Sequence, residues 1–249
     1  MYEVYGIKIG ERAVNSYELS YLTGDQGLTT IAYYFWCLKG PDGITIVDTG
    51  GSIEEAKRRG VLKIRRQEEQ LAKIDVNPES VRRVILTHLH WDHFSRWDMF
   101  PDATFYVQKR DVDFFTGPMA KHEVISRFCS NVSDIVKLQK EGRVEIIEGD
   151  KTVAPGLTVV WVGCHTPGSQ VLVVSTGKGT AVMCGDLHYL YRNIKEDMPS
   201  LIQLDVPECL ASFEKVKNFA SSMDLILPGH DPLLTVVYPE PGDGVAKVA

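Results

Sequence analysis

Three histidines and an aspartate crowd into the stretch Thr-His-Leu-His-Trp-Asp-His at residues 87–93. Histidine is scarce in this sequence, because the whole chain of 249 residues contains only seven. Imidazole and carboxylate groups are common zinc ligands, and a crowded set of them needs a compensating positive charge. The pattern therefore favours a metal site over a group of surface histidines. Its candidate ligands are His88, His90, Asp92 and His93.

Three more apolar stretches end in a histidine or an aspartate beside glycine or proline, where the backbone can turn sharply. They end at His165, Asp186 and His230. Four ligands from one loop cannot surround two metal ions, so we expect these residues to complete two ligand sets. The expected sets are His88, His90 and His165 for one ion, Asp92, His93 and His230 for the other, and Asp186 as the bridge.

Short strands must position these side chains. Segments rich in Val, Ile and aromatic residues, bounded by turn residues, indicate strands at 31–40, 43–50, 81–88, 103–110, 143–150, 157–163, 171–176, 180–186 and 225–230. If the strand that starts at Val81 continues through Thr87, then His88 and His90 point to the same face, because side chains alternate along a strand.

Helices are expected between these strands. One begins after Ser52, where Glu55 completes a capping box. Others are expected over Lys121–Lys140 and from about Pro207 to Met223. No linker or low-complexity segment divides the chain, so we expect one domain over residues 1–249, with sheets at its centre and helices outside.

The composition is that of an ordinary globular protein, with 44% hydrophobic and 24% charged residues. A net charge of −6 argues against a nucleic-acid binder, which usually presents a basic face. No apolar stretch approaches the ~18 residues of a membrane span, and the first residues lack a secretory signal pattern. The five scattered cysteines predict no disulfide framework, and hence a cytoplasmic location. A basic run at 57–66 is expected to form a solvated helix face.

Four motifs, in this order, resemble the metallo-β-lactamase superfamily: THLHWDH at 87–93, HTPG at 165–168, GD at 185–186 and PGHD at 228–231. The resemblance implies an α/β fold, an αββα sandwich. In that fold two mixed sheets lie face to face, helices cover both outer faces, and a dinuclear metal site lies at one edge. Asp48 belongs to the VDTG block of this family, in which the carboxylate supports the metal loops from behind. A plain turn at a strand end is the alternative for Asp48.

The branch is indicated by single residues. His90 stands where flavodiiron proteins carry a glutamate, and Asp186 stands where some true β-lactamases carry a cysteine. Only nineteen residues follow His230, fewer than the helical domain of glyoxalase II would need, and the acidic charge disagrees with the nuclease branch. The chain is most similar to the N-acyl homoserine lactonases, which place a tyrosine three residues after the bridging aspartate. Here that residue is Tyr189, for which an ordinary aromatic wall is the alternative.

The resemblance implies a hydrolase of ester bonds that opens a lactone ring, as the quorum-quenching lactonases do. Two divalent ions would hold a bridging hydroxide, since such ions lower the pKa of water from 15.7 towards about 7. The hydroxide would attack the lactone carbonyl, which one ion and Tyr189 would polarise. Asp92 would pass a proton to the leaving alkoxide. Zinc is the expected metal, and iron, manganese and cobalt suit the same ligands.

The expected partner is a small lactone or ester, with no nucleic acid and no membrane, and a homodimer is an option. Trp91 and Phe94 are expected to add apolar walls to the substrate pocket, as are Phe114 and Phe115.

Other interpretations remain open. A thioesterase like glyoxalase II or a phosphodiesterase is the alternative function, and a non-catalytic metal-binding or partner-binding protein is a further one. His188 is expected to be exposed, with support of the ligands as the alternative. His122 is expected to be structural.

Overall fold

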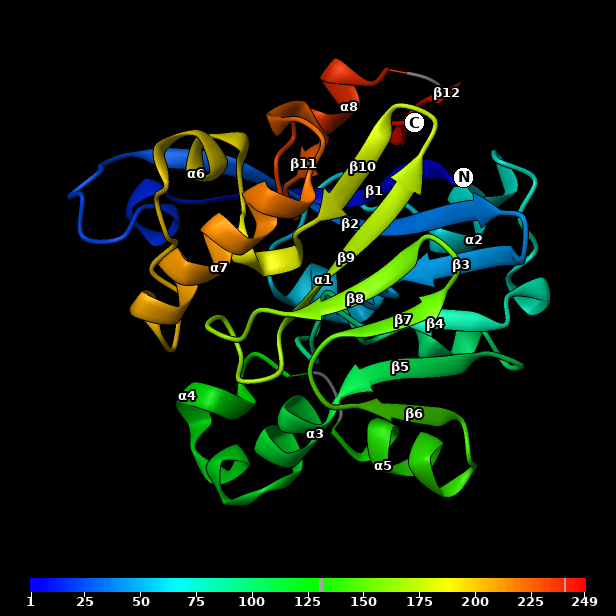
Figure 1. Ribbon diagram of the computed structural model, residues 1–249. Coiled ribbons are helices and arrows are strands. Elements are labelled where there is room, and N and C mark those ends of the chain that lie inside the picture. The colour runs from blue at the N-terminus through cyan, green and yellow to red at the C-terminus, as the bar shows by residue number, and fades with distance from the viewer. Residues whose placement is uncertain (130–131, 240) are drawn as a thin grey trace.

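Two mixed β-sheets lie face to face at the centre of the computed structural model, which describes residues 1–129, 132–239 and 241–249 (Figure 1). Within these residues the larger sheet has eight strands and the smaller has five. Across the larger sheet the order is β12 (Pro241–Gly242), β13 (Val245–Lys247), β1 (Glu3–Asn15), β2 (Leu28–Gly40), β3 (Gly43–Val47), β4 (Arg83–Ile85), β5 (Thr104–Gln108) and β6 (Val144–Ile147). Across the smaller sheet the order is β11 (Ile226–Leu227), β10 (Gly179–Met183), β9 (Gln170–Thr176), β8 (Leu157–Trp161) and β7 (Lys151–Ala154).

Strand β2 shows why the sheets form inner layers. Its central side chains are buried on both faces, and a strand that is apolar on both faces must be covered on both sides. One alternate set packs towards the helices outside the larger sheet: Ile31, Tyr33, Phe35 and Cys37. The other set packs towards the smaller sheet: Ala32, Tyr34, Trp36 and Leu38.

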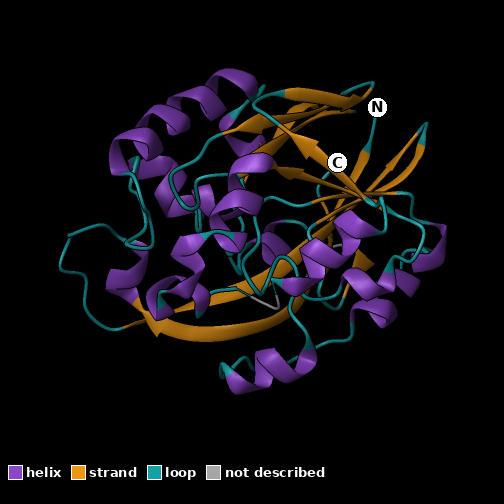
Figure 2. Cartoon of the chain, turned by 90° about the horizontal axis from the view of Figure 1, so that it is seen from below, coloured by secondary structure: helices purple, strands orange, loops and turns teal. Residues whose placement is uncertain are grey.

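Helices cover both outer faces (Figures 1 and 2). The larger sheet is covered by α1 (Ile53–Arg58), α2 (Gln67–Ala72), α3 (Lys109–Thr116) and α5 (Ser133–Lys140). The smaller sheet is covered by α6 (Tyr191–Glu196) and α7 (Val206–Phe219). Two further short helices are α4 (Glu123–Ser126) and α8 (Leu234–Val237). The αββα sandwich that the resemblance implied is confirmed.

Six short 3-10 helices join these elements in the described part of the chain. They are η1 (Ser16–Leu19), η2 (Pro78–Ser80), η3 (Trp97–Met99), η4 (Pro118–Lys121), η5 (Gly185–Leu187) and η6 (Met223–Leu225). Of these, η5 bears most directly on the candidate ligands, because it carries Asp186 at the end of strand β10.

The prediction of one continuous helix over Lys121–Lys140 is wrong. Its range contains the end of η4, then α4 and α5, while residues 130 and 131 lie outside the described residues. The backbone of His122 is extended, which separates η4 from α4. The segment after α4 pairs with the loop that carries the candidate ligands, since the amide of Trp91 donates to the carbonyl oxygen of Phe128 at 2.8 Å. This pairing competes with helix formation.

The other two helix predictions are confirmed in substance. Helix α1 begins after Ser52, whose Oγ accepts a hydrogen bond from the amide of Glu55 at 3.2 Å. Only this half of the predicted capping box forms, because the carboxylate of Glu55 pairs with Arg59. Helix α7 matches the third predicted helix, although it ends before Met223.

The basic run at 57–66 is mostly a loop, because α1 already ends at Arg58. The prediction of a solvated helix face is therefore wrong for part of it. The guanidinium of Arg59 lies 4.9 Å from the ring centre of Trp91, and Arg65 is partly buried.

All five cysteines carry free thiols, which confirms that they form no disulfide framework. In the described part of the chain, no helix has the length and apolar character that crossing a lipid bilayer requires.

Candidate metal centre

The candidate ligands lie on loops that follow strands of both sheets. Strand β4 ends at Ile85, so the prediction that it continues through Thr87 is wrong. Beyond this point a side chain replaces a neighbouring strand as hydrogen-bond partner, since the carboxylate of Asp48 accepts a hydrogen bond from the amide of Thr87 at 2.7 Å. The loop still brings the rings of His88 and His90 together, with their centres 4.6 Å apart.

Seven buried side chains form two groups, and within each group the candidate ligand atoms lie within 4.8 Å of one another. One group is His88, His90, His165 and Asp186, and the other is Asp92, His93 and His230. The six other side chains divide as expected from the sequence, and Asp186, the expected bridge, falls with the first group.

The two oxygens of Asp186 face different groups. Oδ2 lies 3.3 Å from Nε2 of His165 and 3.9 Å from Nε2 of His88. Oδ1 lies 3.0 Å from Nε2 of His93 and 2.9 Å from Nε2 of His230. One carboxylate in this position can bind a cation in each group.

Asp48 holds the second group from behind. Its backbone is left-handed, with φ of 60°, and its side chain is buried. Oδ2 accepts from the hydroxyl of Thr87 at 2.8 Å and lies 2.7 Å from Nδ1 of His93. Because Nδ1 of His93 donates to Asp48, its Nε2 is directed to the centre. This geometry favours the supporting role over a plain turn.

Backbone carbonyls orient two further imidazoles. Nδ1 of His165 lies 2.7 Å from the carbonyl oxygen of Ile202, and Nδ1 of His230 lies 2.8 Å from that of Ala32. Each Nδ1 must carry the proton in these contacts, which leaves the lone pair of Nε2 for a metal.

The donor atoms fit metal ions. Nε2 of His88 is buried, and it has no hydrogen-bond partner in the described part of the chain. A buried polar atom without a partner destabilises the fold, and a divalent cation beside it would satisfy the lone pair of this nitrogen.

The protonation of the first group suits a cation. Burial lowers the pKa of His88 and His90 well below the usual value, and that of His165 below it, so these imidazoles are neutral. Burial alone would raise the pKa of Asp186, but His230, His93 and His165 hold it well below its usual value. The first group therefore presents neutral imidazoles and an ionised carboxylate, as metal binding requires.

The second group holds protons that a cation would displace. Burial disfavours the charged form of His93 and His230, but Asp186, the strongest of the opposing carboxylates, raises the pKa of both. Metal binding at histidine releases such protons.

Asp111 joins the loops of the two sheets, and sequence reasoning missed it. This fully buried side chain in α3 accepts from the amide of Leu89 at 2.9 Å, the hydroxyl of Thr166 at 2.5 Å and the amide of Gly168 at 2.9 Å. Burial raises its pKa to about 6 despite these bonds. The available signal was an acidic residue four positions before Phe115, on the apolar face of a helix.

The prediction that His188 is exposed is wrong. It is fully buried, and its ring centre lies 4.0 Å from that of Phe213 in α7. His188 lies two residues after Asp186, between the smaller sheet and α7, where other side chains rather than solvent surround it. His122, in contrast, is exposed at the start of α4 and lies outside both ligand groups.

Tyr189 lies against the candidate bridge. Its ring stacks on His230 at 4.9 Å between centres, and it lines the same cleft as Asp186. Burial first, and then the charge of Asp186, raise the pKa of this phenol well above its usual value.

A cleft of about 50 Å³ lies over the ligands, and its walls include Asp92, Asp186, Tyr189 and His230. It shares His90 and other wall residues with a larger cavity of about 520 Å³. This larger volume is in the range of small-molecule sites.

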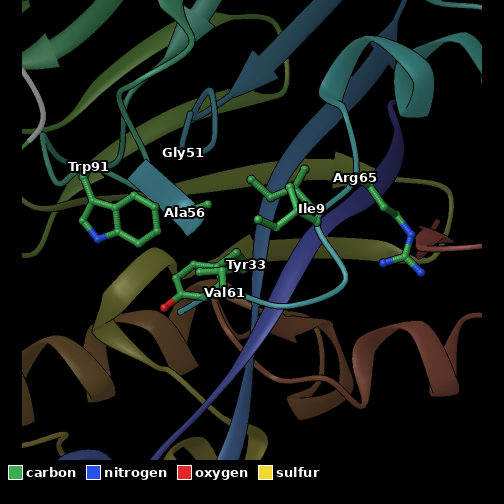
Figure 3. A pocket seen from close by; sticks show the side chains of 8 residues that line it. Ile9, Tyr33, Gly51, Ala56, Val61, Arg65 and Trp91 are labelled. Atoms are coloured by element: carbon green, nitrogen blue, oxygen red, sulfur yellow. The ribbon is translucent and has the colours of Figure 1, made fainter. Parts of the chain in front are cut away.

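The predicted pocket walls divide into two kinds. Trp91 lines the cleft, and it also lines a gap of about 10 Å³ together with Ile9 and Val61 (Figure 3). Phe114 and Phe115 line the larger cavity. Phe94 belongs to the core outside the larger sheet, where its ring centre lies 6.3 Å from that of Phe105. The prediction that Phe94 is a pocket wall is therefore wrong, because its side chain packs in the core between the larger sheet and the helices that cover it.

Known proteins share this sequence pattern. Residues 28–230 match the model of the metallo-beta-lactamase superfamily. An N-acyl homoserine lactonase of a Bacillus species is 26% identical over 215 residues, which cover 79% of this chain and 80% of that protein. The N-acyl homoserine lactonase AttM of Azorhizobium caulinodans is 26% identical over 230 residues, which cover 80% of this chain and 81% of that protein.

Solved structures share the fold. An N-acyl homoserine lactone hydrolase with N-hexanoyl-L-homoserine bound at its catalytic metal centre has a TM-score of 0.75 and 21% identity, over 96% of this chain and 98% of that chain. AidC, a dizinc quorum-quenching lactonase, has a TM-score of 0.74 and 17% identity, over 99% of this chain and 90% of that chain.

These findings confirm the predicted resemblance, including its lactonase branch, and the predicted hydrolase class. The matched region spans most of the sequence and contains all the candidate ligands. This chain therefore belongs to the metallo-β-lactamase superfamily.

Proposed function

We propose that this chain is a dinuclear metal-dependent hydrolase that opens a lactone ring similar to that of an N-acyl homoserine lactone. The observation that carries the proposal is the position of Asp186, with one oxygen towards each ligand group and Tyr189 beside it. The lactonase relatives support the choice of a lactone as substrate.

The donor set suits two divalent ions. His88, His90 and His165 would hold one, Asp92, His93 and His230 would hold the other, and Asp186 would bind both. Such ions would supply hydroxide at neutral pH and would polarise a carbonyl oxygen. Zinc is our preferred metal, since AidC is a dizinc lactonase, and iron, manganese and cobalt suit the same donors.

Tyr189 would stabilise the carbonyl oxygen of the substrate. Its raised pKa keeps the phenol protonated at neutral pH, so the hydroxyl is available as a donor. A buried donor aimed at an oxygen that gains negative charge lowers the barrier more than the same donor in water does.

Asp92 would carry the proton to the leaving group. It lines the cleft, with Oδ2 3.6 Å from Nε2 of His93 and 3.7 Å from Nε2 of His230. A carboxylic acid there could protonate the ring oxygen as its bond to the carbonyl carbon breaks. The product would carry a carboxylate and a hydroxyl on one molecule.

The test compares three substrates with one metal-reconstituted preparation: N-hexanoyl-homoserine lactone, a thioester and a phosphodiester. We expect kcat/KM for the lactone to be at least about tenfold higher than for the others. A preference for the thioester or the phosphodiester would overturn the lactone assignment. A metal content near zero that Zn²⁺, Mn²⁺, Co²⁺ and Fe²⁺ all fail to raise would overturn the dinuclear centre.

The single domain over 1–249, the cytoplasmic location and the homodimer stay predictions. Sedimentation of the purified protein tests the homodimer, and limited proteolysis tests the domain.

A further inference from the structure

Arg12, on strand β1, lines both the cleft over the ligands and the larger cavity. Its Nη1 donates to the carbonyl oxygen of Arg59 at 3.2 Å. Its Nε is buried and has no hydrogen-bond partner among the described residues. A guanidinium carries five N–H donors and keeps its charge in proteins, so Arg12 has donors to offer to a molecule in the cavity.

No carboxylate in the described part of the chain forms an ion pair with Arg12. The neighbouring Arg59, in contrast, pairs with Glu55 at 2.5 Å. Glu18 is the acidic side chain that the walls of both cavities share, and the cleft also has Asp92 and Asp186 in its walls. Glu18 accepts from the amide and the side chain of Asn15 at 3.3 and 2.8 Å. A partly buried cation without a counter-charge is costly, and an anion in the cavity would compensate it.

The rest of the larger cavity is mainly apolar. Its walls include Phe114, Phe115, Phe128 and Leu204, while Arg127 lies at its exposed rim with its guanidinium 4.8 Å from the ring centre of Phe128. The cavity thus offers apolar walls and two arginines beside the candidate metal centre.

We infer that this cavity selects substrates whose acyl part is apolar and ends in a carboxylate that pairs with Arg12. The inference rests on the proposed function and goes beyond it, because a neutral acyl chain would leave Arg12 without an ion-pair partner. Arginine and carboxylate can form two parallel charge-assisted hydrogen bonds, which are stronger than bonds between neutral groups.

A matched pair of lactones tests the inference: homoserine lactone acylated with hexanoic acid, and the same lactone acylated with adipic acid through one carboxyl group. The chains have the same length and differ in the terminal carboxylate. We expect the wild type to prefer the adipoyl lactone about ten- to a hundredfold in kcat/KM, the scale of one hydrogen bond to a charged group. High salt should reduce this preference.

Four variants locate the effect. Arg12→Gln should lower the preference at least about tenfold, Arg12→Lys should keep part of it, and Glu18→Gln should raise it. Arg58→Gln is the matched control, because Arg58 is 73% exposed and lies outside both cavities, and it should leave the preference unchanged. Melting temperatures, measured for all variants, show whether the contact of Arg12 with the Arg59 carbonyl matters for folding.

The outcomes separate this inference from the proposed function. Equal kcat/KM on both lactones, or an equal loss of kcat/KM on both in Arg12→Gln, would show that Arg12 does not bind the terminal carboxylate. If neither lactone is hydrolysed, the proposed function fails, and calorimetric binding of adipic acid monoamide against hexanamide still tests the subsite. Binding of the monoamide that is equal in wild type and Arg12→Gln would mean that its carboxylate binds elsewhere, which overturns the inference.

Discussion

The carboxylate of Asp186 connects the two groups of candidate ligands, because its oxygens lie 2.9 to 3.9 Å from four imidazole nitrogens. Asp186→Asn keeps the shape of the side chain but removes its charge and replaces one carboxylate oxygen by an NH₂ group. Loss of a group that merely orients a ligand costs ten- to a hundredfold in affinity or activity. We therefore expect this variant to retain less metal and to lose more than about a hundredfold in activity. Elemental analysis and lactone kinetics check both, with His122→Ala as the control that should change neither.

Tyr189 gives a second prediction at the scale of one residue, since its hydroxyl is a donor beside the candidate bridge. Tyr189→Phe keeps the ring that stacks on His230, so metal content and folding should be preserved. Lactone kcat/KM should fall by roughly ten- to a thousandfold, mostly in kcat, because the lost bond is strongest in the transition state. Unchanged turnover would assign Tyr189 to the wall alone.

The sequence predicted well which histidines and aspartates gather in space, because such residues at strand ends have few other reasons to cluster. It failed where the packing of distant elements decides the role. Phe94 and Phe115 both belong to the core outside the larger sheet, yet only Phe115 also forms part of the wall of the larger cavity. His188 looked like a surface residue, and only the position of α7 shows that it is covered.

At the scale of elements, helix α3 links the loops after β4 and β8 through Asp111. Burial raises the pKa of this carboxyl to about 6 in the folded state, above its value in the unfolded chain. Protons then favour the folded state, so its contribution to stability is present below about pH 4 and is lost as the pH rises to about 6. The expected loss is roughly 2–3 kcal/mol.

Asp111→Asn isolates this effect, because the amide does not titrate while the neighbouring histidines still do. The variant should be less stable overall, since an amide cannot accept hydrogen bonds at both ends. Its deficit relative to wild type should shrink as the pH rises from 4 to 6. Urea unfolding of both proteins in the presence of a chelator measures the difference, and a deficit that does not change with pH would contradict the assignment.

Short elements were predicted poorly for a related reason. The segment after η4 has a helical sequence pattern, but the hydrogen bond between Phe128 and Trp91 holds it against the loop at 88–93. Strand β4 stops early because Asp48 and Asp111 supply the hydrogen-bond partners that a neighbouring strand would otherwise provide. Such long-range partners are invisible to local patterns, whereas the two-sided burial of β2 could be read from its continuous run of apolar residues at 31–38.

At the scale of the whole molecule, the two groups of candidate ligands join the two sheets. The candidate ligands at 88–93 follow β4 of the larger sheet, while His165, Asp186 and His230 follow strands of the smaller one. Ions bound to the folded state alone would stabilise it by mass action, by about 4 kcal/mol at a free concentration a thousand times the Kd.

Removal of the metal should therefore weaken the whole molecule and not only the loops. We expect a chelator to lower the Tm of the purified protein by several degrees in a single transition, and added Zn²⁺ to restore it. Calorimetry with and without chelator checks this. A Tm that is indifferent to both treatments would mean that the loops hold no ion.

The contact between His165 and the carbonyl oxygen of Ile202 also bears on how this enzyme could evolve. The segment at 201–204 forms a wall of the larger cavity and orients His165, a candidate ligand. The amide of Leu204 also donates to the carbonyl oxygen of Cys164 at 2.6 Å. Side-chain changes at Leu201 or Leu204 could alter the substrate range at little cost, since these contacts use only the backbone. Insertions or deletions in the same segment would displace His165, so divergence here should proceed by substitution, with loop length held constant.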